Sequence, residues 1–160
     1  MKTLVVYYSQ ACSNTKRIAE MIQKAYSADI AQIETVTPYT GSYEDIVNQG
    51  QEEVTSGFMP KIKELSADIS AYENIILCTP TWWYTMAPAV RTFLAENDLK
   101  GKKIAAVQTH GGWPGHVFAD IKKLCKIRNM KTLSVQFDST GGDELVTDMS
   151  ELERGIGELL

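Results

Sequence analysis

The sequence has few cysteines and histidines, and their spacing suggests neither a disulfide framework nor a metal site. The three cysteines, Cys12, Cys78 and Cys125, include no Cys-x-x-Cys pair. Cys78 lies in an apolar run and Cys125 on the apolar face of a predicted helix, so we expect both in the core. The histidines, His110 and His116, share one glycine-rich loop with no carboxylate at ligand spacing. We therefore predict no metal centre.

Long hydrophobic runs and clustered positive charge are missing as well. No apolar run approaches the ~20 residues that span a bilayer, and no signal segment precedes the first apolar run. Lysine and arginine are interspersed in a chain of net charge -4, which argues against a nucleic-acid partner. We expect a cytoplasmic protein with no membrane contact. Its 160 residues of ordinary composition are enough for a single domain, residues 1–160.

Apolar runs alternate with helical patterns along the chain. Residues 4–8, 74–79 and 104–107 are continuous apolar runs, typical of central strands, whereas residues 31–33 and 133–137 alternate as edge strands do. Helical spacing follows each strand, and two short helical pieces are expected before the third strand, at residues 43–69, broken near Gly57 and Pro60. The pattern predicts an α/β fold, a three-layer α/β/α sandwich around a five-stranded parallel sheet of order 2-1-3-4-5.

In such a sheet, ligands bind beyond the carboxyl ends of the strands where the strand order reverses, here between the first and third strands. Loops 9–15, 80–88 and 109–116 leave the sheet at that place. These loops therefore hold the candidate site residues.

The first loop joins a buried strand to a helix N-terminus and is rich in hydroxyl and amide side chains. It consists of Ser9, Gln10, Ala11, Cys12, Ser13, Asn14 and Thr15. Free N–H groups and the helix dipole make such a turn an anion site. A helix start that Ser13 or Asn14 caps, with no ligand, is the alternative. A cap needs one such residue, so the abundance of donors favours phosphate.

Cys12 in this loop raises a second possibility, a nucleophilic phosphatase cysteine. Low-molecular-weight tyrosine phosphatases use Cys-x5-Arg, whereas Arg17 gives Cys-x4-Arg here, and no Asp-Pro pair supplies a general acid. The hydrolase alternative is therefore disfavoured by spacing.

The second loop places three aromatic rings in a row after a buried strand: Pro80, Thr81, Trp82, Trp83 and Tyr84. The tryptophans either cap the core or present flat faces to a ligand. The third loop contains Thr109, His110, Gly111 and Gly112, whose glycines let the backbone approach a ligand. Either histidine of that loop makes a single hydrogen bond or donates a proton to a reduced ring. A phosphate site, aromatic faces and a close backbone together indicate FMN, since no Gly-x-Gly-x-x-Gly turn for a dinucleotide is present.

These motifs resemble those of flavodoxins and flavodoxin-like FMN-binding proteins. The first loop, with Tyr7-Tyr8-Ser9 and Asn14-Thr15-Lys16, is similar to their phosphate loop, although it lacks that loop's glycine and is one residue longer. The resemblance extends over Pro80-Thr81-Trp82-Trp83 and Thr109-His110-Gly111-Gly112.

The resemblance implies a flavodoxin-like fold and non-covalent FMN. It implies that the phosphate is held by Ser9, Ser13, Asn14 and Thr15, and that Pro80 and Thr81 line the ribityl chain. It also implies that the ring pocket is shaped by Trp82, Trp83 and Tyr84. The other edge of the ring would contact Thr109, Gly111 and Gly112. No protein side chain is predicted to be catalytic. The expected function is electron transfer, as a carrier for a redox partner protein or as a small reductase for a quinone-like acceptor. A cofactor-free interaction module is the remaining alternative.

Overall fold

The computed structural model describes residues 2–160. Its strands are β1 (Thr3–Tyr7), β2 (Asp29–Gln32), β3 (Asn74–Trp82), β4 (Thr85–Met86), β5 (Lys103–His110) and β6 (Lys131–Gln136). Its α-helices are α1 (Asn14–Tyr26), α2 (Tyr43–Ser56), α3 (Pro88–Glu96), α4 (Val117–Cys125) and α5 (Met149–Gly157), with short 3-10 turns η1 (Ala11–Ser13) and η2 (Ile69–Ala71).

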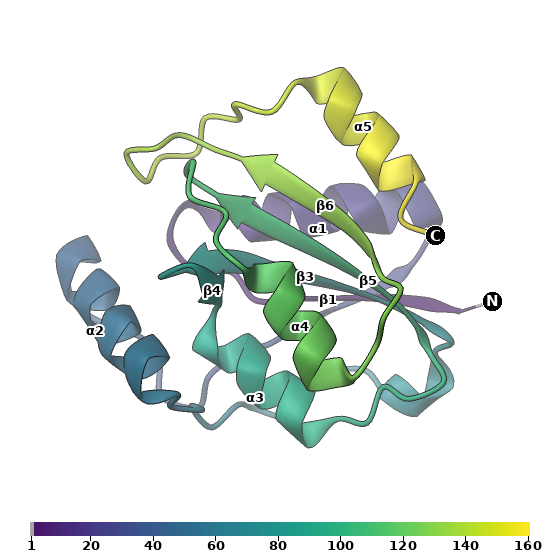
Figure 1. Cartoon of the computed structure of the whole chain (residues 1–160), viewed down its shortest axis with the longest axis horizontal. Coiled ribbons are helices and arrows are strands. Elements are labelled where there is room, and N and C mark those ends of the chain that lie inside the picture. Colours follow the sequence, from purple (N-terminus) through teal and green to yellow (C-terminus); the bar gives the residue numbers. More distant parts are fainter. Residues whose placement is uncertain (1) are drawn as a thin grey trace.

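The strands form one sheet in the order β2-β1-β3-β5-β6, and each of these pairs is parallel. The fold-class prediction is confirmed, including the two edge strands and the reversal between the first and third strands. The addition is β4, which pairs antiparallel with the end of β3. Figure 1 shows the arrowheads of the parallel strands pointing to the side where α2 lies, with both termini at the other end.

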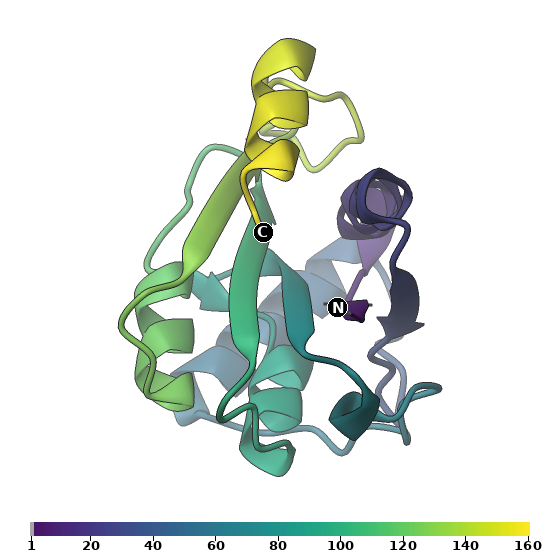
Figure 2. The ribbon, with the colours of Figure 1, turned by 90° about the vertical axis from the view of Figure 1, so that its right-hand side faces the viewer.

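Two apolar cores fill the spaces on the two faces of the sheet, because successive side chains of a strand point to opposite faces. Along β3, Ile75 and Leu77 enter the core beneath α3 and α4, whereas Ile76 and Cys78 enter the core beneath α1 and α5. Figure 2 shows these helix pairs on opposite sides of the sheet. Both faces of the central strands are therefore covered, as their continuous apolar runs predict.

The prediction of a second helical piece before the third strand is wrong. After α2 ends at Ser56, with Gly57 as its C-cap, the described chain contains no α-helix until α3; residues 61–63 run antiparallel beside residues 34–36 instead. Val36 N–H donates to the carbonyl of Lys61 at 2.9 Å, and Lys63 N–H to that of Glu34 at 2.8 Å. The apolar residues of this stretch still pack on the core. The apolar residues of this stretch have helical spacing in the sequence, but the segment is extended. Its backbone forms hydrogen bonds with residues 34–36 in place of those that a helix would make.

Within residues 2–160, no helix combines the length and the apolar character needed to cross a membrane.

Candidate functional site

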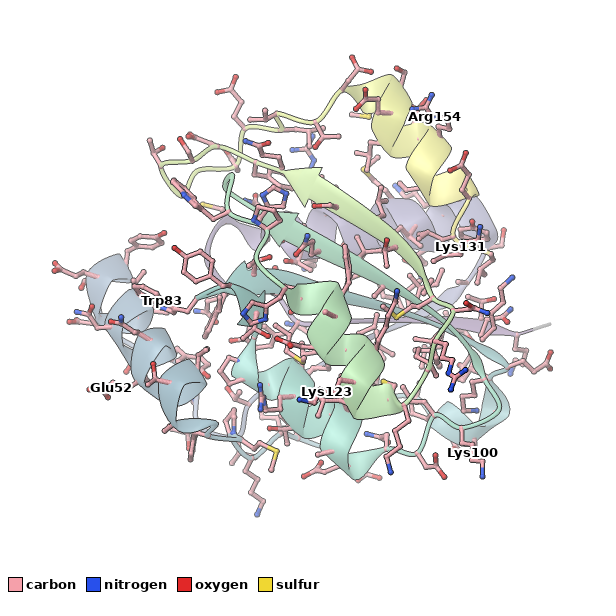
Figure 3. The ribbon with its side chains drawn as sticks, in the orientation of Figure 1. Glu52, Trp83, Lys100, Lys123, Lys131 and Arg154 are labelled. Atoms are coloured by element: carbon pink, nitrogen blue, oxygen red, sulfur yellow. The ribbon has the colours of Figure 1, made fainter. Side chains whose placement is uncertain are left out.

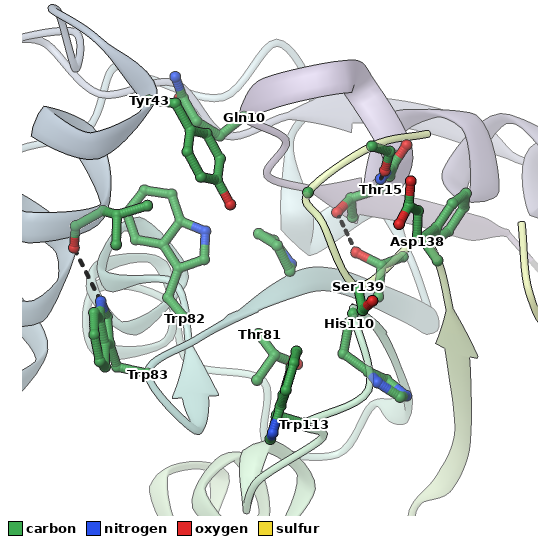
Figure 4. Close-up of a pocket in the computed structure, with 18 of the residues that line it drawn as sticks. Gln10, Thr15, Tyr43, Thr81, Trp82, Trp83, His110, Trp113, Asp138 and Ser139 are labelled. Atoms are coloured by element: carbon green, nitrogen blue, oxygen red, sulfur yellow. Dashed lines mark hydrogen bonds between the residues drawn. The ribbon is translucent and has the colours of Figure 1, made fainter. Parts of the chain in front are cut away.

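A crevice of about 490 Å³ lies beyond the carboxyl ends of β1, β3 and β5, at the reversal of strand order. Its volume is within the range of small-molecule and cofactor sites. The three predicted loops, the start of α2 and the segment after β6 contribute to its walls (Figure 4). The topology therefore brings together loops that are far apart in the sequence.

The first loop is built from unusual backbone conformations. Cys12 and Ser13 both have φ of 56°, in the left-handed region that non-glycine residues rarely adopt. Ser13 is the N-cap residue of α1 but makes no side-chain capping bond, so the predicted cap is wrong in its chemistry. Ser9 Oγ instead accepts a bond from Lys16 N–H at 3.3 Å. A left-handed turn leads into the helix, and the Ser13 side chain makes no bond to the first-turn N–H groups.

Asn14 and Thr15 face the crevice from the first turn of α1. Thr15 Oγ1 lies 2.8 Å from Thr109 Oγ1, which links the first and third loops. Asn14 Nδ2 donates to the carbonyl of Gly142 at 3.0 Å, while Asn14 Oδ1 is buried without a hydrogen-bond partner. Buried polar atoms are nearly always paired, so this oxygen calls for a donor such as a ligand hydroxyl.

The segment after β6 lies against the first loop. Cys12 Sγ–H donates to the carbonyl of Gly141 at 3.4 Å, and Arg17 Nη1 donates to that of Asp143 at 3.4 Å. The Arg17 guanidinium also lies over the Phe137 ring, 5.9 Å from its centroid. Arg17 is thus held beside the segment after β6 and Cys12 is not among the residues lining the crevice, an arrangement unlike the arginine fork over a nucleophilic cysteine that a phosphatase needs.

The aromatic stretch is a hairpin rather than the predicted loop. Pro80, Thr81 and Trp82 are the last residues of β3, and Trp83 and Tyr84 form a two-residue turn into β4. Both turn residues have positive φ, 48° and 70°, the requirement of a type I′ hairpin turn. Such turns usually contain asparagine or glycine, so this turn could not be predicted from the sequence. The strained turn fixes the direction of the aromatic rings at the crevice.

The two tryptophans have different surroundings. Trp82 is half-buried and is held edge-on by Tyr8 and Tyr39, with ring centroids 5.8 Å and 5.2 Å away. Trp83 is 39% exposed, and its indole N–H donates to the carbonyl of Val47 in α2 at 3.0 Å. Figures 3 and 4 show Trp83 beside α2. Trp82 packs on the core, as one alternative predicts, and also lines the crevice, so presenting its face to a ligand stays a prediction.

The third loop packs closely on its neighbours. A Cβ on Gly111 would lie 3.3 Å from the carbonyl oxygen of Asp138, and one on Gly115 would lie 2.1 Å from that of Tyr84. His110 Nδ1 accepts a bond from Gly112 N–H at 3.0 Å. The glycines here allow backbone segments to approach one another, in addition to the predicted approach to a ligand.

A polar cluster clamps the hairpin turn to α4. His116 N–H donates to the carbonyl of Tyr84 at 2.7 Å. Asp120 Oδ2 lies 2.5 Å from His116 Nδ1 and accepts the Thr85 hydroxyl at 2.5 Å. His116 therefore stabilises the turn and does not line the crevice.

Burial shifts the ionisation of several groups around the crevice. It lowers the pKa of His110 and, together with the nearby Glu53, raises that of Tyr8. A backbone hydrogen bond from Thr140 lowers the pKa of Asp138. A neutral His110 agrees with its Nδ1 accepting a bond. Asp138 is then a negative charge on the crevice wall.

Most of the predicted site residues meet in the crevice. Those that line it are Gln10, Asn14, Thr15, Pro80, Thr81, Trp82, Trp83, Tyr84, Thr109, His110 and Gly111. The predicted residues that do not line it are Ser9, Cys12, Ser13 and Gly112, while the side chain of Ala11 lies outside the described part of the structure. These four belong to the same loops as the lining residues.

Sequence reasoning missed two walls of the crevice and one aromatic ring. The missed lining residues are Tyr43, Ile46, Val47, Trp113, Phe137, Asp138, Ser139, Gly141 and Gly142. A signal existed for the segment after β6, because a polar, glycine-rich loop follows a parallel strand and so must reach the same edge of the sheet. Nothing local indicated that α2 would turn its first two turns toward the crevice. Residues 2–160 contain no cluster of three histidine, cysteine or acidic side chains suited to a metal.

A family model described as Flavodoxin matches residues 2–147. The chain belongs to the flavodoxin family. No curated protein matches this flavodoxin in sequence. Three solved structures illustrate the similarity of fold. A candidate flavoprotein from Bacteroides eggerthii is 25% identical with a TM-score of 0.78, covering 99% of this chain and 97% of its own. One from Bacteroides uniformis is 20% identical with a TM-score of 0.78, covering 98% of each chain.

The third is a flavoprotein from Lactobacillus acidophilus in complex with FMN. It is 19% identical with a TM-score of 0.71, covering 83% of this chain and 91% of its own. The family match confirms the resemblance to flavodoxins that the sequence motifs indicated, and the solved structures share the fold.

Proposed function

We propose that this flavodoxin binds FMN in the crevice and transfers electrons through it. The observation that carries the proposal is the crevice itself: a helix N-terminus and an aromatic wall face one cavity at the strand-order reversal of a flavodoxin-family chain. Membership of the flavodoxin family supports FMN as the cofactor, and the Lactobacillus acidophilus neighbour is in complex with FMN. FMN, when bound, supplies the electron-accepting ring.

The first loop and α1 supply what a phosphorylated chain needs. The first turn of α1 leaves N–H groups free of intrahelical acceptors, and the helix dipole favours an anion there. Of the four residues expected to hold the phosphate, Asn14 and Thr15 line the crevice and would contact it. The unpartnered Asn14 Oδ1 fits a hydroxyl donor of the ribityl chain beside it. Neutral donors and the helix dipole would thus bind the phosphate end.

The walls of the crevice supply what a flat ring needs. Trp82, Trp83 and Tyr84 on one side and Thr109 and Gly111 on the other would enclose the ring, with Pro80 and Thr81 along the ribityl chain. Aromatic walls exclude water, and Asp138 opposes the addition of negative charge nearby. Both effects favour the oxidised form of a ring that gains electrons. The protein contributes binding and electrostatics, and FMN contributes the chemistry.

A comparison of FMN with riboflavin tests the cofactor and the phosphate site together. We expect FMN to bind at least about tenfold more tightly than riboflavin, because charge-assisted hydrogen bonds to phosphate are the stronger kind. Asn14→Ala should weaken FMN binding about tenfold, the loss expected from one or two hydrogen bonds, whereas Asn129→Ala, in an exposed loop, should not change it. A chain that takes up no FMN would overturn the proposal.

A turnover assay distinguishes a protein partner from a quinone as the acceptor of electrons. NAD(P)H oxidation should be followed with FMN-loaded chain, with and without a quinone. Turnover that requires the quinone identifies a small reductase. No turnover, with reduction by a partner reductase instead, identifies a carrier.

A further inference from the structure

Glu53 is a buried acidic residue beside the crevice that the proposed function does not use. It is 9% exposed and lies on α2. Its Oε1 accepts the Tyr39 hydroxyl at 2.6 Å, and its Oε2 accepts Gln49 Nε2 at 2.9 Å. Both oxygens accept, which is the pattern of an ionised carboxylate.

Glu53 has no cation beside it. In the part of the chain that the structure describes, the ion pairs join Lys63 to Glu34 and His116 to Asp120. A buried charge without a counter-ion is unfavourable unless hydrogen bonds stabilise it. The hydrogen bonds from Tyr39 and Gln49 stabilise the Glu53 carboxylate, and the field of a buried charge acts on nearby groups with little screening by solvent.

Aromatic contacts connect Glu53 to the crevice wall. The Tyr39 ring that donates to Glu53 lies edge-on to Trp82, with an interplanar angle of 74°. Tyr8 holds Trp82 from another side at 82°, and its hydroxyl donates to Gln10 Oε1 at 3.0 Å. Trp82 and Gln10 both line the crevice. The orientation of Tyr39, set by Glu53, therefore helps to fix the plane of Trp82.

The same helix face presses on Trp82 directly. Gly50 is one turn from Glu53, and a Cβ there would lie 3.2 Å from Trp82 Cε3. The first turns of α2 carry Tyr43 and Val47, which also line the crevice. Glu53 thus joins α2 to the core at the level of the aromatic wall.

We propose that Glu53 is a positioning residue for the cofactor site: through Tyr39 it fixes Trp82 and α2 as crevice walls, and its buried charge opposes the reduction of bound FMN. This proposal rests on the proposed function. Tyr39 and Gln49 donate hydrogen bonds to the carboxylate and hold it in place. The effect on the reduction of FMN therefore comes from the charge of Glu53, in addition to the packing of its side chain.

Glu53→Gln tests the charge, because glutamine keeps the size of the side chain. We expect the reduction equilibrium of bound FMN against a reference dye to shift at least about threefold toward reduced FMN, as loss of a weakly screened negative charge predicts. Glu52→Gln is the matched control: Glu52 is the exposed neighbour on the outer face of α2, where solvent screens it (Figure 3). Equal shifts for the two variants would overturn the role of the charge.

Tyr39→Phe tests the positioning and keeps the carboxylate. In a chain with Trp83 and Trp113 replaced by phenylalanine, Trp82 is the remaining tryptophan, and its near-ultraviolet circular dichroism reports how firmly the ring is held. We expect Tyr39→Phe to reduce that signal at least about twofold, because the buried bond that orients Tyr39 is lost. An unchanged signal would overturn the positioning role. This measurement needs no FMN, so it separates failure of this proposal from failure of the proposed function.

Discussion

Gly115→Ala should destabilise the protein far more than its position in an exposed loop suggests. Gly115 has φ of +60°, and an added Cβ would lie 2.1 Å from the carbonyl oxygen, 2.4 Å from the Cα and 2.5 Å from the carbonyl carbon of Tyr84. All three atoms belong to backbone, so no side chain can rotate away. Alanine in the left-handed region costs about 1 kcal/mol, and overpacking adds roughly 1–3 kcal/mol. The expected loss in free energy of unfolding is about 2–4 kcal/mol.

Gly57→Ala separates these two contributions. Gly57 also has a left-handed backbone, with φ of +69°, but no atom lies within 4 Å of the added Cβ. Gly57→Ala should lower the free energy of unfolding by only about 1 kcal/mol, which is the cost of placing alanine in this backbone conformation. Urea unfolding followed by circular dichroism measures both variants, and each kcal/mol corresponds to roughly 2–4 °C in Tm for a chain of this size.

The clash should also disturb the crevice. The Tyr84 carbonyl accepts the His116 N–H bond that clamps the hairpin turn, so displacing it moves Trp83 and Tyr84. We expect weaker FMN binding in Gly115→Ala and none of this effect in Gly57→Ala. Equal losses of stability in the two variants would refute the argument that close backbone approach, and not backbone conformation, requires Gly115.

Three further predictions concern the crevice. Trp82→Ala should lower the free energy of unfolding by roughly 2–3 kcal/mol, which is below the range for a fully buried tryptophan, and Trp83→Ala by about 1 kcal/mol because Trp83 is more exposed. Urea unfolding and FMN titration measure both variants. A larger loss of stability in Trp83→Ala would contradict the burial argument. Burial lowers the pKa of His110 from its ordinary 6.5, so its contribution to stability is complete above about pH 6.5 and is lost as the pH falls toward the lowered pKa. His110→Gln should therefore flatten the stability profile between about pH 7 and 5, and an unchanged slope would contradict this sign. Cys12→Ser should leave FMN affinity within about threefold, because the Cys12 thiol makes only a weak hydrogen bond. Neither the original chain nor the variant should hydrolyse a phosphate monoester. Phosphatase activity that is lost on substitution would restore the hydrolase alternative.

Strand order was predictable because burial is written into the sequence as a local pattern. Central strands such as β1 and β3 are covered on both faces and have continuous apolar runs, whereas β2 and β6 alternate as edge strands do. The order and the crossover rule together placed the crevice and eleven of its lining residues. The glycine-rich segment after β6 could have been added by the same argument.

Tertiary structure alone decided how the crevice is walled and held. The turn at Trp83 and Tyr84 adopts a conformation that neither residue favours, because pairing of β3 with β4 and the clamp from His116 impose it. The side of α2 that faces Trp82 could likewise not be predicted from its sequence, since residues distant in the chain hold the helix, through bonds such as those from Tyr39 to Glu53 and from Trp83 to Val47. Local propensity and periodicity determined which segments form the sheet and its edge. Contacts between residues distant in the sequence determined the shape of the site.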